Sequence, residues 1–215
     1  MSNNLGRLGL KVAFSVLAGS LALSFGAGIA GAQEKSATTI VNQLKPKPLT
    51  RSLAISPADS ARNAAGESFI NSVRHRTTRS LSSGEREKIA EVTKDKPSID
   101  LEINFEFDSA RIGSEAAPQV NELGKALTDA SLKGNTFVVA GYADGKGRAE
   151  YNQSLSERRA DAVKRYLTEN YGIPAANLVT VGYGSTHFKN PDDPFAAENR
   201  RVAVTNMADK QLSSK

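Results

Sequence analysis

The feature that most constrains the fold is a change in the spacing of apolar residues after residue 98. From Ile99 to Phe107 apolar and polar residues alternate, which predicts a strand with one buried face. Three further apolar runs, at residues 136–140, 178–183 and 201–205, are short and bounded by turn residues, as in buried strands. The pattern of apolar residues in the second half of the chain therefore predicts four strands.

Two segments between these strands have helical periodicity instead. Apolar residues recur every three or four positions within residues 116–132, and again within residues 149–171, where Gly172 ends the pattern. The order β-α-β-α-β-β predicts an α/β (α+β) fold in which two main helices pack on a mixed four-stranded sheet.

The first 32 residues have the pattern of a secretory signal peptide. Arg7 and Lys11 precede the uncharged, apolar stretch Val12–Ala30, and Ala30-Gly31-Ala32 supplies an A-x-A cleavage pattern. We expect cleavage after Ala32; the alternative is an uncleaved membrane anchor. The sequence contains no cysteine, so no disulfide can stabilise an exported product and its core must suffice.

Residues 33–97 are predicted to form a basic, largely flexible tether. The stretch from 33 to 80 has few large apolar residues, and residues 33–98 carry twelve Lys and Arg against seven Asp and Glu. Ser82 and Glu85 resemble a capping box and predict a short helix near residues 84–93. The folded domain is expected at 98–208, with a tail at 209–215.

The uneven distribution of charge along the chain indicates which partners each segment could bind. A basic arm at 33–80 suits an outer-membrane protein or a membrane surface. Residues 99–215 carry fourteen basic against sixteen acidic residues, which with export disfavours a nucleic-acid partner.

One acid, one amide and one arginine are expected to converge after the second strand. Asp144 lies in a glycine-rich loop directly after residues 136–140. Asn152 and Arg159 are seven residues apart, so on a helix they share one face and are separated by roughly 10 Å along its axis. Such a set can hold an ammonium and a carboxylate of one ligand at once.

Six motifs in order resemble the C-terminal domain of the OmpA family, the module also found in Pal lipoproteins and flagellar stator proteins. The resemblance covers residues 101–206. The motifs are FEFDSARI (105–112), GYADGKG (141–147), YNQSLSERRADAVKRYL (151–167), GI (172–173), VGYG (181–184) and NRRV (199–202).

The resemblance implies non-covalent binding of peptidoglycan through the diaminopimelate of its stem peptide, without a cofactor or metal. By motif, Asp144 corresponds to the acid that meets the ligand's ammonium and Arg159 to the arginine that meets its carboxylate. Asn152 corresponds to a hydrogen-bonding Asn and Asp108 to the polar residue of the FDSA loop. Either Arg200 or Arg201 would line the pocket, since a strand directs only one of two neighbours to a given face.

Two positions depart from the family's usual G-H-T-D loop, because Tyr142 and Ala143 replace its His and Thr. The loss of the Thr hydroxyl at Ala143 could weaken binding, but the charge pair is retained. The tyrosines Tyr142, Tyr151 and Tyr183 are interpreted as packing residues.

Other functions find less support in the residues. A peptidoglycan hydrolase would need a zinc site, a Cys–His pair or an activated Ser, and the two histidines, His75 and His187, are far apart in the sequence. A proton-conducting stator would need an acid within its spanning helix, and Val12–Ala30 has none. We therefore expect a non-enzymatic, periplasmic protein that links a cell-envelope component to the wall. Its oligomeric state is left open.

Overall fold

The structure is a computed structural model of the chain, and it describes residues 34–46 and 56–208. The predicted signal peptide and the predicted tail at 209–215 lie outside the described residues. Within the described ranges, every helix is too short or too polar to cross a membrane.

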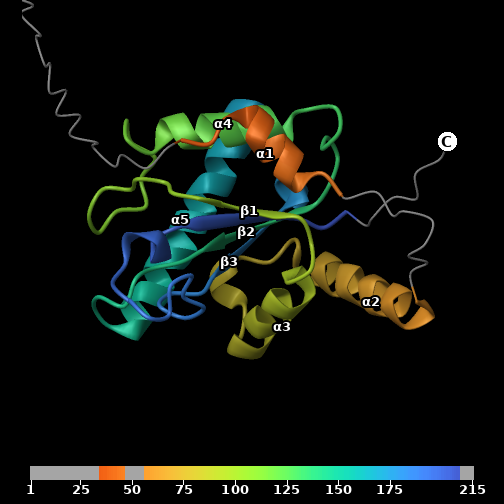
Figure 1. The fold of residues 1–215 in the computed structure, drawn as a ribbon, viewed down its shortest axis with the longest axis horizontal. Coiled ribbons are helices and arrows are strands. Elements are labelled where there is room, and N and C mark those ends of the chain that lie inside the picture. The colour runs from red at the N-terminus through yellow and green to blue at the C-terminus, as the bar shows by residue number, and fades with distance from the viewer. Residues whose placement is uncertain (1–33, 47–55, 209–215) are drawn as a thin grey trace, which may run out of the picture. The chain divides into compact units, whose positions relative to one another are not determined.

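A mixed sheet of four strands forms the centre of the fold (Figure 1). Its order is β1 (Ser98–Leu101), β4 (Val202–Asn206), β2 (Phe137–Gly141), β3 (Leu178–Gly182). β2 and β3 are parallel, whereas β4 runs antiparallel to both β1 and β2. The predicted α/β class and the mixed four-stranded sheet are confirmed.

The first strand is shorter than its alternating pattern predicted. β1 ends at Leu101, which pairs with Val202, the first residue of β4. The chain beyond Leu101 has no partner strand left to extend the ladder, so residues 102–116 form a loop. Phe107, expected on the buried face of a strand, is fully exposed in this loop.

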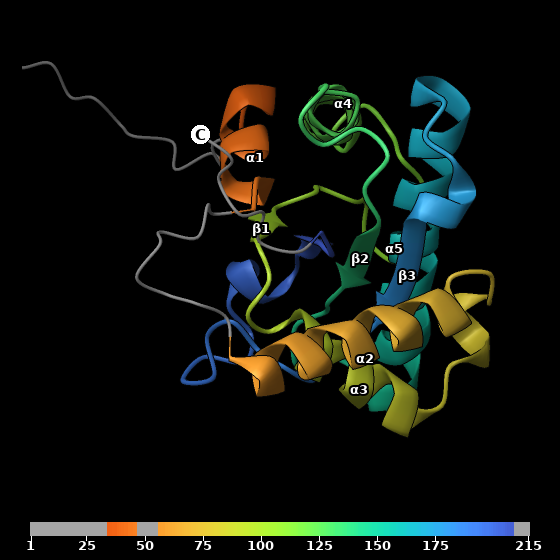
Figure 2. The same ribbon diagram turned by 90° about the vertical axis from the view of Figure 1, so that its right-hand side faces the viewer.

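One face of the sheet is covered by three helices, α1 (Ala37–Leu44), α4 (Ala117–Leu127) and α5 (Ala149–Tyr171). Phe137 and Val139 point into this layer, as the period of two requires. The opposite face is covered by α2 (Pro57–Val73), α3 (Ser83–Thr93) and the 3-10 turn at Thr78–Ser80. Figure 2 shows α1 and α4 on one side of the strands and α2 and α3 on the other.

Both faces are therefore buried, which explains why all residues of β2, β3 and β4 are buried. Two short 3-10 turns, Ala175–Asn177 and Ala197–Asn199, precede β3 and β4.

The expectation of a largely flexible tether at 33–97 is wrong for most of its described part. Ile40 and Leu44 of α1 are completely buried in the same core as β1 and α4, and Ile70 of α2 is buried against the other face. The segment has few large apolar residues, but helical spacing places them on one side of each helix. Low average hydrophobicity concealed this pattern.

Specific polar contacts also hold these segments to the sheet. The Lys35 backbone N–H donates to Gln119 Oε1 (2.7 Å), and Gln119 Nε2 donates back to the Lys35 carbonyl (3.0 Å). The buried Asn206 donates from Nδ2 to the Leu44 carbonyl at the end of α1 (2.9 Å). Burial and satisfied polar groups make α1 an integral part of the fold.

The predicted helix near 84–93 is confirmed as α3, with its capping box. Ser82 Oγ accepts from the Glu85 backbone N–H (3.2 Å), and the Glu85 carboxylate accepts from the Ser82 backbone N–H (2.8 Å). Pairing of these two groups satisfies donors that a helix N-terminus otherwise leaves free.

Candidate ligand-binding site

The site lies where the ends of β2 and β3 meet the first half of α5. Glycines at these strand ends let the helix approach the backbone closely. A Cβ at Gly141 would lie 2.3 Å from the Ser156 carbonyl oxygen, and one at Gly182 would lie 2.6 Å from the Glu157 backbone nitrogen. Any larger residue would push α5 away from the sheet, and α5 carries two of the predicted ligand-binding residues.

The loop after β2 is fixed by backbone hydrogen bonds on several sides. The Tyr142 N–H donates to the Arg201 carbonyl (3.0 Å), the Ala143 N–H to the Gly184 carbonyl (2.7 Å), and the Gly145 N–H to the Pro194 carbonyl (2.8 Å). These bonds span three different segments of the chain. The position of Asp144 is therefore determined before any ligand arrives.

Asn152 contributes to the same support. It is almost fully buried, and its Nδ2 donates to the backbone carbonyls of Asp144 (3.1 Å) and Lys146 (2.8 Å). The sequence predicted a ligand contact from this amide. The structure shows its NH₂ group engaged in holding the loop.

Asp144 is 8% exposed, and its carboxylate is hydrogen-bonded on both oxygens. Oδ1 accepts from the Lys146 backbone N–H (3.0 Å), and Oδ2 accepts from Arg200 Nη1 (2.8 Å). The Arg200 side chain is about half exposed, at 46%, against 10% for that of Asp144. The acid is thus held rigidly, while its cationic partner reaches it from the solvent side.

Arg159 is 9% exposed and lies on the inner face of α5, as predicted. Its Nε donates to the Ser109 carbonyl (3.0 Å), and its guanidinium carbon lies 4.9 Å from the centre of the Phe105 ring. Among the described residues no carboxylate lies within ion-pair distance of it. Within the part of the chain that the structure describes, Arg159 is a nearly buried cation that forms no ion pair.

The surroundings of Arg159 alter its proton affinity. Burial lowers the pKa of its guanidinium below the ordinary value, and the positive charge of Arg200 lowers this pKa further. Asp144 and Asp108 act in the opposite direction, but more weakly than burial does. Their charges therefore act on Arg159 without a direct ion pair, and the desolvated cation favours an added anion.

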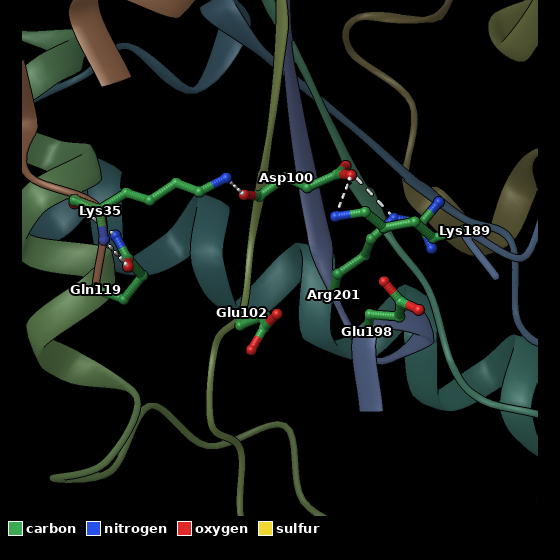
Figure 3. A pocket seen from close by; sticks show the side chains of 7 residues that line it. All are labelled: Lys35, Asp100, Glu102, Gln119, Lys189, Glu198 and Arg201. Carbon is green, nitrogen blue, oxygen red and sulfur yellow. Dashed lines mark hydrogen bonds and ion pairs between the residues drawn. The ribbon is translucent and has the colours of Figure 1, made fainter. Parts of the chain in front are cut away.

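Arg201, the other arginine considered for the pocket, points elsewhere. Its guanidinium carbon lies 3.8 Å from the centre of the Tyr142 ring, and its Nη2 donates to the His187 carbonyl (3.1 Å). Figure 3 shows Arg201 and Lys189 directed at the same carboxylate, that of Asp100. Of the two neighbouring arginines, Arg200 alone is paired with Asp144.

The remaining predicted residues lie around the site. Asp108 is exposed and has a positive φ of 55°, a conformation uncommon outside glycine, so the chain turns sharply just before Ser109. Ala143 is buried, at 4% exposure, within the pinned loop. Tyr183 is also buried and stacks on Tyr142 with ring centres 5.2 Å apart, so both are packing residues. Tyr151, given the same role, is 41% exposed.

Sequence reasoning missed two contributors to the site. The Ser109 carbonyl and the Phe105 ring hold the Arg159 side chain, and both belong to the FEFDSARI motif. Their place in that motif was the available signal. Spacing alone cannot identify a backbone acceptor and an aromatic ring as partners of an arginine that lies 50 or more positions further along the chain.

Taken together, these contacts present a fixed anion and a fixed cation that do not neutralise each other. An anion and a cation of this kind are the groups that an ammonium and a carboxylate of one ligand would require. Within the described residues no group of three or more His, Cys, Asp or Glu side chains is arranged to hold a metal ion.

Comparisons with known proteins match this part of the chain. The sequence profile of the OmpA family matches residues 104–201. A peptidoglycan-associated lipoprotein from Pseudomonas putida is 39% identical over 102 residues, which cover 46% of this chain and 59% of that protein. Outer membrane porin F from Pseudomonas aeruginosa is 32% identical over 116 residues, covering 53% of this chain and 31% of the porin.

Among solved structures, the cell wall anchor of the type VI secretion system (T6SS) from Pseudomonas aeruginosa is 26% identical. The alignment has a TM-score of 0.44 and covers 52% of this chain and 81% of that one. The chain spans only about a third to three fifths of the two curated relatives described above. Within those limits, residues 104–201 of this chain are similar to the domain of the OmpA family.

Proposed function

We propose that the protein binds peptidoglycan non-covalently through the diaminopimelate of the stem peptide. In doing so it would anchor or link a cell-envelope component to the cell wall. The observation that carries this proposal is Arg159, a nearly buried guanidinium that forms no ion pair among the described residues and on which the charge of the fixed Asp144 carboxylate acts. The name of one similar protein, a peptidoglycan-associated lipoprotein, supports the ligand class.

Diaminopimelate in a stem peptide presents an α-ammonium and a carboxylate on one carbon. In the proposed complex the ammonium meets Asp144 and the carboxylate meets Arg159. A nearly buried, unpaired charge is costly, and an incoming carboxylate removes that cost. The binding free energy therefore comes from side chains that are already in position and from an arginine that lacks its anion until the ligand binds.

Arg200 has a defined role in this scheme. In the free protein its guanidinium donates a hydrogen bond to Asp144 Oδ2. In the proposed complex the ligand's ammonium would take the place of this guanidinium. Because the Arg200 side chain is about half exposed, it can turn away and add a second positive charge near the ligand's carboxylate. Asn152 and Ala143 would then act through the loop they support, without touching the ligand by a side-chain donor.

A sacculus pull-down tests the proposal. Asp144→Ala and Arg159→Ala should each weaken binding by about 30-fold or more, since truncating one member of a desolvated charge contact costs about 2–5 kcal/mol. Arg165→Ala is the matched control, because Arg165 lies on the same helix with an exposed side chain. Free meso-diaminopimelate should compete with sacculi for the wild-type protein.

Equal retention of all three variants would refute the site, and failure of diaminopimelate to compete would refute the ligand. The alternative function, a peptidoglycan hydrolase, predicts release of soluble muropeptides from the same sacculi; we expect none. We place the protein in the periplasm, in association with peptidoglycan. A contact of residues 33–80 with an outer-membrane protein or membrane surface stays a prediction.

A further inference from the structure

Tyr142 lies two residues before Asp144, at the position where the OmpA family's loop usually has His. Its ring makes two stacking contacts, each with a residue from another segment. The Arg201 guanidinium carbon lies 3.8 Å from the ring centre. The Tyr183 ring is stacked at an interplanar angle of 26°, with ring centres 5.2 Å apart. The Tyr142 N–H also donates to the Arg201 carbonyl at 3.0 Å, so both the ring and the backbone of Tyr142 are held.

Arg201 is a well-fixed partner for this ring. Its side chain is only 9% exposed, and its Nε lies 3.4 Å from Oδ1 of Asp100 on β1. Its Nη2 donates to the His187 carbonyl at 3.1 Å. Within the described residues, the buried Nε and Nη1 atoms have no hydrogen-bond partner. A desolvated guanidinium of this kind is attracted strongly by an aromatic face, so the contact with Tyr142 helps to replace its lost hydration.

Tyr183 connects the same ring to another part of the fold. It is buried, and its N–H donates to the carbonyl of Gly141 at the end of β2 (3.0 Å). Its hydroxyl donates to the carbonyl of Arg86 on α3 (3.1 Å). The ring of Tyr142 is therefore held by one residue that is bonded to β2 and α3 and by another, Arg201, that is paired with β1.

The two segments that meet at Tyr142 also carry two charged residues of the candidate site. Tyr142 contacts Arg201, and the neighbouring Arg200 donates from Nη1 to Asp144 Oδ2 at 2.8 Å. The two contacts follow each other along the same pair of segments. A shift of Tyr142 relative to Arg201 would therefore shift Asp144 relative to Arg200.

The other contacts of this loop reach different parts of the fold. The carbonyls of Gly184 and Pro194, which accept from loop N–H groups, both belong to the segment between β3 and β4. Asn152 holds the loop from the side of α5. Without the ring of Tyr142, the loop would lose its side-chain connection to the sheet and to α3.

We propose that Tyr142 is a positioning residue, which keeps Asp144 and Arg200 in the geometry that the ligand meets without touching the ligand itself. This inference rests on the proposed function, because it takes Asp144 as the ligand-binding acid. If the contacts of the ring are lost, the loop leaves the binding geometry in a fraction of the molecules. The apparent affinity falls in proportion to the fraction that stays in place. The same fraction governs hydrogen exchange, since the amides of Ala143 and Gly145 are protected only while their hydrogen bonds exist.

The test compares two substitutions of Tyr142 in the full chain. Tyr142→Leu keeps an apolar side chain but removes the aromatic face, and it should weaken sacculus binding about tenfold. A loss of this size means that the loop is in place in about one molecule in ten. Exchange of the Ala143 and Gly145 amides, followed by nuclear magnetic resonance, should then approach the rate of an unfolded chain, while amides of α4 stay protected. Tyr142→Phe retains the ring and should restore both binding and protection.

Two further variants separate positioning from a general loss of stability. Ile40→Ala removes a core contact under α1, so it should lower the melting temperature but keep sacculus binding and protection of the loop amides. Arg201→Lys keeps a positive charge beside Asp100 but loses the flat guanidinium over the ring. It should loosen the loop as Tyr142→Leu does, and it decides the question if Tyr142→Leu does not fold.

The outcomes distinguish this inference from the proposed function. Wild-type affinity in Tyr142→Leu would overturn the inference. Weakened binding with the loop amides still protected would also overturn it, because Tyr142 would then act by contacting the ligand. In both cases the proposed function stands. If the wild-type protein does not bind sacculi, or binds them without competition by meso-diaminopimelate, the proposed function fails and the inference fails with it.

Discussion

Replacement of Ile40 by Ala tests whether α1 is part of the folded body. Ile40 is completely buried and shares its core with β1, α4 and α5. Truncation of a buried Ile to Ala costs about 2–5 kcal/mol, from lost transfer free energy and the cavity left behind. A value of about 3 kcal/mol is a large share of the ~5–15 kcal/mol that stabilises a typical domain.

The expected signal is therefore large. For a body of this size, each kcal/mol shifts the melting temperature by about 2–4 °C, so Ile40→Ala should lower it by about 6–12 °C. Thermal melts followed by far-ultraviolet circular dichroism would measure the shift. Sacculus binding well below the melting temperature should be unchanged, because Ile40 lies in the core and contributes nothing to the ligand-binding site.

Gln43→Ala is the matched control, since Gln43 lies on the same helix and is exposed. Its effect should stay within about 0.5 kcal/mol. If Ile40→Ala has the same melting temperature as Gln43→Ala and the wild type, then α1 does not pack on the sheet in solution. The reasoning from burial would then be refuted, and the original expectation of a flexible tether restored.

Two further substitutions probe the site and the cap of α3. Gly141→Ala would place a methyl group 2.3 Å from the Ser156 carbonyl, so it should destabilise the fold by about 1–3 kcal/mol and weaken sacculus binding, whereas Gly84→Ala, with open space, should do neither. Hydrogen bonds from the Ser82 backbone and from Arg76 lower the pKa of Glu85 from 4.5 to about 2. Glu85→Gln should therefore lower the melting temperature at neutral pH, and this difference should shrink as the pH falls from 4.5 towards 2.

The sign of this pH effect follows from the lowered pKa. The folded state favours the ionised carboxylate, so the contribution of Glu85 is present above the pKa of the unfolded chain and is lost as the folded-state pKa is approached. A melting-temperature difference that is constant between pH 7 and pH 2 would contradict the assignment of the cap.

Much of the domain was predictable because local sequence patterns indicate where its helices lie and end. The helix expected at 149–171 is found at Ala149–Tyr171, where Gly172 adopts a left-handed φ of 64° and ends it. The capping box of α3 was readable for the same reason, since both partners lie within four residues. Periodicity and capping act over one or two turns, a range that the order of residues reveals directly.

The prediction failed where the length or the order of an element depends on residues far away in the sequence. β1 ends at Leu101 because β4 begins at its partner, Val202, about a hundred residues later. α1 is ordered because Gln119 and Asn206 bind its two ends, and no pattern within 33–46 reveals those contacts. Phe107 continues the alternation of a strand, yet it lies beyond the point where pairing stops.

Residue order by itself determined the types of the main elements after residue 98 and the face of α5 that carries Asn152 and Arg159, because these depend on local spacing. Only the tertiary structure decided that Arg200 is paired with Asp144 while Arg201 turns to Asp100, and that Arg159 has no carboxylate partner among the described residues. These outcomes depend on how segments far apart in the sequence pack against each other. Charge pairing and burial are properties of that packing, and no local pattern encodes them.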